Sequence, residues 1–366
     1  MTAPATPDIS VVVVSFNTRG LLRECLTSLA TECRALASVA VNETPVAACR
    51  VGASADFPSV PPGFGPARSV TASDVFGPAA EVFVVDNVSR DGSADMVERE
   101  FPDVILIRSQ VNLGFAAANN RAFPLAKGRY IVLLNSDAFL HPGALRLAVE
   151  HMDAEPSTGL GGARLVGRDG SWQPSARAFP SPLNDLLTLT GISSRFPRSR
   201  FFGRFDRTWA DQNEPADVDW VPGAFSIIRR EALGRVGYFD EAFFLYYEEV
   251  DLCRRIRYAG YEIRYWPDVV VVHLGGESSK TVQTVKMSSS GSQLALWRMR
   301  SAFLYYRKHH GIAAWFTKQQ EKLWHQLRAW KNRTGPKAEE SRVLVSLLDR
   351  AWRETAGGAV SPQRPW

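Results

Sequence analysis

Cysteine and long hydrophobic runs are both scarce in this chain of 366 residues. The four cysteines have neither Cys-x-x-Cys spacing nor local histidines, so no disulfide framework and no zinc site is indicated. No run reaches the ~18 apolar residues that a membrane span requires. The N-terminal stretch MTAPATPDIS also lacks the basic and apolar regions of a signal peptide. We therefore expect a cytoplasmic protein without a transmembrane helix.

A strong excess of one charge is also missing. The formal net charge is +5 and the isoelectric point is near 9.1, while charged residues make up an ordinary 22% of the chain. This balance suits an anionic or phosphorylated partner but does not require one. The 45% hydrophobic and 11% aromatic content argues against disorder, so we expect one main globular domain with extensions.

Short apolar runs alternate with helical patterns along the first part of the chain. The run ISVVVVSFN at 9–17 is followed by RGLLRECLTSLA, in which leucines recur at helical spacing. Similar apolar runs lie at 81–87, 104–109 and 130–135. This alternation predicts an α/β fold with a mostly parallel sheet covered by helices on both faces. Sheets of this type bind ligands at the carboxyl ends of their strands.

The main domain is expected to span residues 1–285, with one interruption. Between about 31 and 80 the chain is rich in Ala, Val, Ser, Pro and Gly. This segment includes PSVPPGFGPARS, which cannot continue a helix or a strand. We therefore predict an irregular insertion at about 31–80.

The C-terminal part interleaves aromatic residues and leucines with arginines and lysines. This pattern predicts a basic amphipathic helical extension over 286–350, with Trp324, Leu327 and Trp330 along one side, and a disordered tail at 351–366. The extension could contact the anionic inner face of a membrane or pack on the main domain. Nucleic-acid binding is a third interpretation of the charges, but no recognition module accompanies them, so no nucleic acid is expected.

Polar residues follow three of the predicted strands: SFN at 15–17, DNVSRDGS at 86–93 and NSDA at 135–138. Because the carboxyl ends of parallel strands share one edge, these tips should lie together. Asp137 at such a tip is well placed for Mg²⁺ or Mn²⁺, which takes one or two protein oxygens and completes its shell with water and phosphate. The alternative is that these residues only form turns or a helix N-cap.

An ordered set of motifs gives the chain a family resemblance. In sequence order they are VVVVSFN, VVDNVSRDGS, NLGFAAANNRA, LLNSDA, VPGAFSIIRREAL, FDEAFFLYYEEVDLCRRIRYAGYEI and HLGGESS. This series resembles the family 2 inverting glycosyltransferases of GT-A fold, and is most similar to their bacterial rhamnosyltransferase-like members. The resemblance covers about 9–279 apart from the insertion. It implies a three-layer α/β/α domain of GT-A type.

The resemblance also implies a nucleotide-sugar site and a divalent metal. Asp137 would bind the metal, although Asn135 stands where the family's motif has a first carboxylate. His273 corresponds to a late histidine that in many relatives reaches the metal or the diphosphate; a lone histidine at a strand end is otherwise often structural. The residues expected around the nucleotide-sugar are Asn17, Asp86, Asn87, Ser89, Asp91, Asn112, Gly114, Asn119 and Asn135.

Three carboxylates are crowded into the stretch YYEEVDLCRR: Glu248, Glu249 and Asp251. Inverting transfer needs a base that takes a proton from the acceptor hydroxyl, and an apolar surround would raise the pKa of such a base. The family's base aligns with Glu249, although the family more often has Asp there, so the choice between Glu248 and Glu249 stays open. Asp251 is expected to support the base. The alternative is that all three acids stabilise a helix N-terminus.

A second aromatic segment precedes these acids. Trp220 could stack on a sugar ring, and Gly223 and Ala224 would let a ligand approach the backbone. The resemblance places this segment at the acceptor and donor sugar. The alternative for Trp220 is ordinary core packing.

The leading hypothesis is an inverting glycosyltransferase at the inner face of the membrane. It would move a sugar from a nucleotide donor to a hydroxyl of a cell-surface glycan or a lipid-linked saccharide. The best single candidate for the donor is dTDP-L-rhamnose, which supplies L-rhamnose. One alternative is a sugar nucleotidylyltransferase, but SFNTRGLL is a poor phosphate loop for that class. Another is a non-catalytic sugar- or nucleic-acid-binding module.

Overall fold

The computed structural model describes residues 7–41, 76, 79–275 and 290–357. Within them, a ten-stranded sheet has the order β3-β2-β1-β4-β9-β6-β10-β5, and β7 and β8 pair with β6 and β10. The strands are β1 (Ile9–Ser15), β2 (Ala80–Asp86), β3 (Ile105–Arg108), β4 (Tyr130–Asn135), β5 (Ala138–Leu140), β6 (Thr158–Val166), β7 (Trp172–Gln173), β8 (Ala216–Asp217), β9 (Phe225–Arg229) and β10 (Glu262–His273).

Helices connect these strands and form the C-terminal part. They are α1 (Arg19–Val41), α2 (Ser93–Glu100), α3 (Gly114–Ala122), the 3-10 helix η1 (Phe123–Leu125), α4 (Ala144–Ala154), α5 (Pro182–Leu189), α6 (Ile192–Arg195), α7 (Arg230–Val236), α8 (Glu248–Tyr258), α10 (Ser290–His310), α11 (Ala313–Asn332) and α12 (Pro336–Glu354).

The sheet is mixed but mostly parallel, as the alternating pattern predicted. Strands β1, β2, β3 and β4 pair in parallel, and β6 and β10 pair in parallel with each other. Strand β9 lies antiparallel between β4 and β6, so these two groups point the same way. The carboxyl ends of all six strands therefore face one edge.

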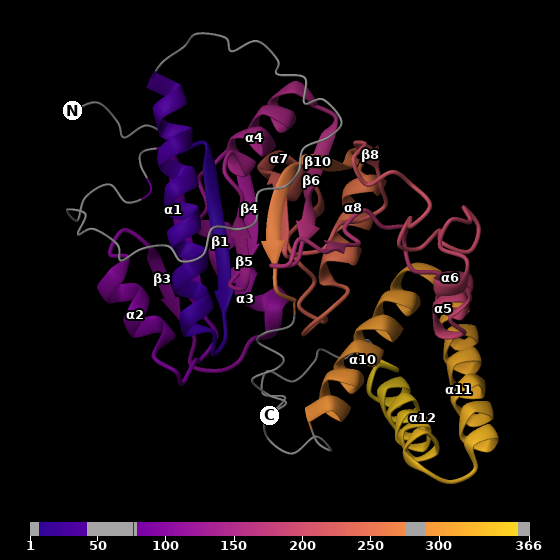
Figure 1. Cartoon of the computed structure of the whole chain (residues 1–366). Helices are drawn as coiled ribbons and strands as arrows, with labels where there is room; N and C mark the ends of the chain where they lie inside the picture. The colour runs from indigo at the N-terminus through magenta and orange to yellow at the C-terminus, as the bar shows by residue number, and fades with distance from the viewer. Residues whose placement is uncertain (1–6, 42–75, 77–78, 276–289, 358–366) are drawn as a thin grey trace.

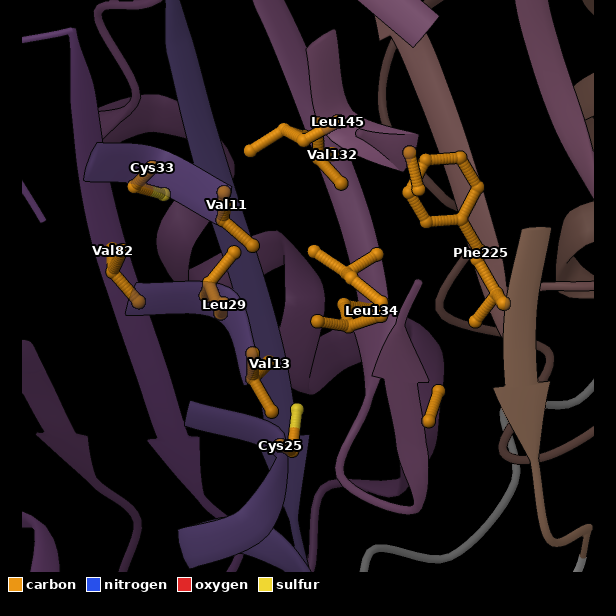
Figure 2. Packing of buried hydrophobic residues seen from close by; sticks show 14 of the residues in the cluster. Val11, Val13, Cys25, Leu29, Cys33, Val82, Val132, Leu134, Leu145 and Phe225 are labelled. Atoms are coloured by element: carbon orange, nitrogen blue, oxygen red, sulfur yellow. The ribbon is translucent and has the colours of Figure 1, made fainter. Parts of the chain in front are cut away.

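Each face of the sheet is covered by a separate hydrophobic core, because alternate residues of a strand point to opposite faces. Val11 and Val13 of β1 pack with Leu29 of α1 on one face, which Figure 2 shows. Val12 packs on the other face in a core that includes Ala116 of α3. This gives the three-layer α/β/α architecture of the prediction.

Two predicted boundaries are wrong. Residues 31–41 were expected to be irregular, but they continue α1, and Cys33 and Leu36 are buried in the first core. The local alanine and leucine content is compatible with a helix, and the buried side chains hold it on the sheet. The rest of the predicted insertion to Ala79 lies outside the described residues, except Phe76, which is buried, and Ala79 itself. The expected disordered tail began at 351, but α12 continues to Glu354.

The C-terminal helices α10, α11 and α12 pack on one another beside the main domain (Figure 1). A small core of their own includes Phe303 from α10 and Leu348 from α12. The predicted C-terminal helical extension is a three-helix unit. Within 7–41, 79–275 and 290–357, no helix has both the length and the apolar character needed to cross a membrane.

Candidate active site

A cavity of about 300 Å³ opens at the carboxyl ends of the strands. Strand register brings the tips together, since Ser15 pairs with Asp86 and Val14 pairs with Asn135. Ten of the residues selected from the sequence line this cavity: Asn87, Asn112, Gly114, Asn135, Asp137, Gly223, Ala224, Glu248, Glu249 and His273.

At one end of the site, the tips of β1 and β2 are tied together. The backbone N–H of Asn17 donates to Ser89 Oγ at 3.0 Å, and the backbone N–H of Arg90 donates to Asn17 Oδ1 at 2.7 Å. Asp86 Oδ2 accepts from the backbone N–H of Ser89, while Asp86 Oδ1 is buried and has no hydrogen-bond partner in the described part of the chain. Burial raises the pKa of Asp86. Asp86 Oδ1 is therefore an acceptor without a donor.

Backbone strain accompanies these tips. Asn17 and the β-branched Val88 both have positive φ, at 53° and 65°. Such conformations are unfavourable for side chains other than glycine and often occur at functional sites. The side chains of Ser89 and Asp91 hold this backbone conformation. Ser89 Oγ accepts from the Asn17 N–H, and Asp91 accepts from the backbone N–H groups of Arg19 and Ser93.

Asn87 holds the segment that enters α3. Its Nδ2 donates to Asn112 Oδ1 at 2.8 Å and to the Gly114 carbonyl at 3.2 Å, and its Oδ1 accepts from the Leu113 N–H at 2.7 Å. Gly114 has φ of 77°, and a Cβ there would overlap the backbone carbonyl of Phe244. Glycine is therefore required where α3 meets the segment before α8.

Asp137 and His273 lie far apart in the sequence but close together in space. His273 Nε2 is 3.6 Å from Asp137 Oδ1 and is buried without a hydrogen-bond partner among the described residues. His273 Nδ1 faces Gln173 Oε1 at 3.1 Å, which orients the ring. Burial lowers the pKa of His273, so the neutral, metal-binding form of the imidazole is favoured. A carboxylate and a neutral imidazole form a donor pair that suits a divalent cation with open positions.

Within residues 7–41, 79–275 and 290–357, no group of three or more histidine, cysteine or acidic side chains could hold a metal by itself. Asp137 and His273 would thus hold a cation only together with oxygens from another source. This matches the preference of Mg²⁺ for one or two protein ligands plus phosphate and water.

Glu248 and Glu249 begin α8 and both line the cavity. Burial raises the pKa of Glu248 well above its usual value, and the charge of Glu249 raises it further. Burial also raises the pKa of Glu249, but the positive charge of Arg177 opposes this shift. One oxygen of each carboxyl group, Oε2, is buried without a hydrogen-bond partner within the described ranges. The two groups are therefore poised to accept a proton or a hydrogen bond from a ligand.

The residues just before these acids are strained. Tyr246 and Tyr247 have φ of 70° and 69°, a left-handed conformation that is rare for two consecutive bulky residues. The turn directs the first residues of α8 toward the cavity. Such strain persists only where surrounding packing holds it.

Helix α10 supplies that packing. Four of its residues, each four positions apart, contact the segment in order: Trp297 with Phe244, Ser301 with Leu245, Tyr305 with Tyr247 and His309 with Asp251. Residues at this spacing share one face of a helix. One face of α10 therefore runs along the whole strained segment.

Asp251 was expected to support catalysis, but it does not line the cavity. Its side chain is fully buried and is paired with Arg255 at 2.8 Å, Lys308 at 2.9 Å and His309 at 2.7 Å. Burial acts to raise the pKa of Asp251, but hydrogen bonds from His309 and Lys308 and the charge of Arg255 outweigh it and lower the pKa to about 2. Asp251 lies on another side of α8 and ties it to α10.

Six further predicted site residues do not line the cavity: Asn17, Asp86, Ser89 and Asp91, which form the strand-tip network described above, and Trp220 and Asn119. Trp220 is 6% exposed, and its indole N–H donates to the Ala178 carbonyl at 2.8 Å within the second core. Asn119 is 1% exposed and donates to the Phe115 carbonyl inside α3. Both positions fit core packing, which was the alternative for Trp220.

Some cavity residues were missed in the sequence. Phe16, Ser136 and Tyr246 stand inside motifs that were selected for their neighbours. Leu294 comes from α10. No local signal marks Leu294, because its place depends on a helix that follows the main domain.

Comparison with known proteins identifies the family of this chain. A family model described as glycosyl transferase family 2 matches residues 68–237. The crystal structure of GalNAc-T7 with UDP, GalNAc and Mn²⁺ matches with a TM-score of 0.50 and 14% identity, over 96% of this chain and 56% of that one. At this identity, the likeness shows the fold alone.

Two curated relatives are rhamnosyltransferases. The chain is 29% identical over 205 residues to N-acetylglucosaminyl-diphospho-decaprenol L-rhamnosyltransferase of Mycobacterium tuberculosis H37Rv, covering 52% of this chain and 66% of that protein. The chain thus spans just under two thirds of that relative's length. It is 32% identical over 205 residues to rhamnosyltransferase WbbL of Escherichia coli K12, covering 52% of this chain and 69% of that protein. The chain therefore belongs to glycosyl transferase family 2, the glycosyltransferases of GT-A-type fold.

Proposed function

We propose that this protein is an inverting glycosyltransferase that moves L-rhamnose from dTDP-L-rhamnose to a hydroxyl of a cell-surface glycan or a lipid-linked saccharide. The choice of sugar is supported by the two rhamnosyltransferase relatives. The choice of a lipid-linked acceptor is supported by the name of the first, which contains a diphospho-decaprenol. Contact of the C-terminal helices with a membrane surface is part of this proposal.

Glu249 is the proposed general base. The observation that carries this assignment is that Glu249 lines one cavity with the Asp137–His273 pair and, unlike the buried Glu248, is partly exposed. A raised pKa brings a carboxylate closer to neutral pH, where it removes a hydroxyl proton more effectively. Glu248 is the weaker candidate, because it is 3% exposed and its carboxyl group has a stronger preference for the protonated form.

Asp137 and His273 are the proposed ligands of a Mg²⁺ or Mn²⁺ ion, and the unpartnered His273 Nε2 fits this role. Such an ion would offset the negative charge of the departing diphosphate. Asn135 lines the same wall and offers amide groups to the diphosphate or the sugar.

The nucleotide is proposed to bind beside the β1 and β2 tips. Asp86 Oδ1 is a buried acceptor that an N–H group of a base could satisfy. Asn87 and Gly114 shape the neighbouring wall, and Gly223 and Ala224 form a part with little side-chain bulk. Aromatic rings of Phe16 and Phe115 make the cavity partly apolar, which would exclude water from the reaction.

A thermal-shift panel of nucleotide-sugars, with and without Mn²⁺, tests the donor site. The melting temperature should rise most with dTDP-L-rhamnose plus Mn²⁺, and EDTA should abolish that increment. Asp137→Ala should remove the metal-dependent shift. If no nucleotide-sugar raises the melting temperature and EDTA has no effect on it, the donor site is contradicted. If Asp137→Ala retains the metal-dependent shift, the metal binds elsewhere.

Transfer itself needs a separate assay. Purified protein, dTDP-L-rhamnose and a polyprenyl-diphosphate-linked N-acetylglucosamine should form a product with inverted anomeric configuration, measured by mass spectrometry and NMR. If another sugar is transferred from its nucleotide instead, the proposed class of reaction stands and the assignment of L-rhamnose is wrong.

A further inference from the structure

Helix α11 presents an apolar stripe to solvent. Its members recur at intervals of three, four and seven residues, so they share one face of the helix. They are Ile312 just before the helix, at 80% exposed, and Phe316 at 54%, Leu323 at 55%, Leu327 at 51% and Trp330 at 76%. On the opposite side, Ala314, Thr317 and His325 are buried. The helix thus packs through a partly polar face and exposes its apolar one.

A second exposed apolar group lies in α5, which packs on α11, and in the segment that follows α5. Leu183 and Leu186 of α5 are each 38% exposed, and Phe196 and Phe201 in the following segment are 51% and 53% exposed. Gln320 of α11 donates to the Pro182 carbonyl at 2.7 Å, which joins the two elements. Figure 1 shows α5 and α6 beside α11 at the edge of the molecule away from α1. Together the two groups form what we call the α11–α5 surface.

Arginines without carboxylate partners accompany this surface. Arg195, Arg198 and Arg200 are exposed, and none of them forms an ion pair with a residue that the structure describes. Arg200 instead lies 4.7 Å above the ring of Trp209. Asp211 and Glu214 line the same pocket as Arg198 and Arg200 but form no ion pair with them, so these guanidinium groups are available to an external anion.

We propose that the α11–α5 surface binds the face of a bilayer that contains anionic phospholipids. Exposed tryptophan, phenylalanine and leucine side chains enter the boundary between headgroups and acyl chains, while arginines bind lipid phosphates. A large exposed apolar patch marks an interaction site. The unpaired arginines favour a phosphate-bearing bilayer over a second copy of this positively charged chain.

This inference rests on the proposed function in one respect: an enzyme with a lipid-linked acceptor must reach that acceptor at a membrane. Its test needs neither donor nor acceptor, so a failure here would remove only the membrane contact from the proposed function and leave the donor site and the transfer reaction to their own tests. The full-length protein is sedimented with vesicles of phosphatidylcholine alone or mixed with phosphatidylglycerol. It should bind the mixed vesicles, and high salt should weaken that binding because it screens the arginine–phosphate contacts.

The decisive variant is Leu323→Gln, Leu327→Gln and Trp330→Gln combined, in which glutamine maintains helix propensity. Binding to mixed vesicles should weaken by at least about tenfold, because three large apolar side chains leave the interface. The matched control replaces three exposed apolar residues elsewhere, Ile105, Leu125 and Tyr258, by glutamine, and should bind like the wild type. Circular dichroism verifies that both variants fold.

A second variant separates the charge from the apolar stripe. Arg195→Gln, Arg198→Gln and Arg200→Gln combined should lose the preference for phosphatidylglycerol without altering α11. The inference is overturned if the wild type binds neither vesicle, if the α11 variant binds as well as its control, or if the arginine variant retains the full preference. Dimerisation in analytical ultracentrifugation that the α11 changes abolish, without vesicle binding, would instead assign the surface to a second copy.

Discussion

Ser301 Oγ on α10 donates a 2.8 Å hydrogen bond to the backbone carbonyl of Leu245, directly before the left-handed Tyr246 and Tyr247. This bond links a helix outside the sheet to the turn that aims Glu248 and Glu249. It gives the C-terminal helices a role in shaping the candidate active site.

Replacing Ser301 by Ala should therefore lower kcat. Without this bond the strained turn can relax, and a small displacement of a catalytic group can cost about tenfold or more in rate. The KM for the donor should change little, because the nucleotide is expected beside β1 and β2. Steady-state kinetics with both substrates measures this split.

Ser341→Ala is the matched control for Ser301→Ala. Ser341 is also fully buried, and its hydroxyl donates to the Lys337 carbonyl within α12 at 2.9 Å and accepts from Arg328 of α11 at 3.3 Å, away from the cavity. Both variants should lose similar thermal stability, and only Ser301→Ala should lose kcat. Equal kcat losses in the two variants would refute the positioning role of Ser301.

Glu249→Gln should abolish most transfer and leave donor binding intact. A general base contributes about 10²- to 10⁴-fold, so the loss in kcat should fall in that range, against a smaller loss for Glu248→Gln. Because the pKa of Glu249 is raised above 4.5, the wild-type rate should rise with pH through a midpoint above 4.5. Rates measured across pH at saturating substrate test this. If Glu248→Gln is the more damaging change, the base is Glu248.

The pH dependence of stability should report on Glu248. Its folded pKa is raised above its unfolded value, so its neutral form favours folding at low pH, and this contribution is lost as pH rises from 4.5 through the folded pKa. Glutamine has no proton to lose. Glu248→Gln should therefore gain stability relative to the wild type as pH rises, which urea unfolding at several pH values measures. A stability difference that is constant with pH would show that Glu248 does not titrate in this way.

Gly114→Ala should disrupt both folding and activity. Its positive φ costs a side chain about 1 kcal/mol, and the added Cβ would overlap the Phe244 carbonyl, so the total loss should exceed about 2 kcal/mol. Gly170→Ala is the control, because Gly170 has φ of 76° but no neighbouring atom lies within 4 Å of the position that a Cβ would take. It should lose only the conformational cost. Denaturant unfolding separates the two, and similar losses would mean that the contact with Phe244 can adjust.

The strand tips show how much of the candidate site could be predicted from local sequence. Apolar runs closed by polar residues predicted β1, β2 and β4, and parallel pairing then required Asp86 and Asn135 to share an edge. This follows from side-chain alternation and from the direction of parallel strands, which are local properties of the chain. The mostly parallel sheet and its covering helices were confirmed. The catalytic and ligand roles of the cavity residues remain predictions.

Tertiary packing decided the rest. The sequence placed Glu249 and Asp251 two positions apart, but only the docking of α10 decided that Asp251 pairs with Lys308 and His309 while Glu249 faces the cavity. Likewise, helical periodicity marked the apolar side of α11, but the packing of α11 on α12 and α5 decided that this side is exposed. Contacts between segments far apart in the chain set burial and charge pairing. By itself, the sequence determined the sheet and the chemistry at its edge, and the tertiary structure decided which acid meets the ligand and which apolar face meets solvent.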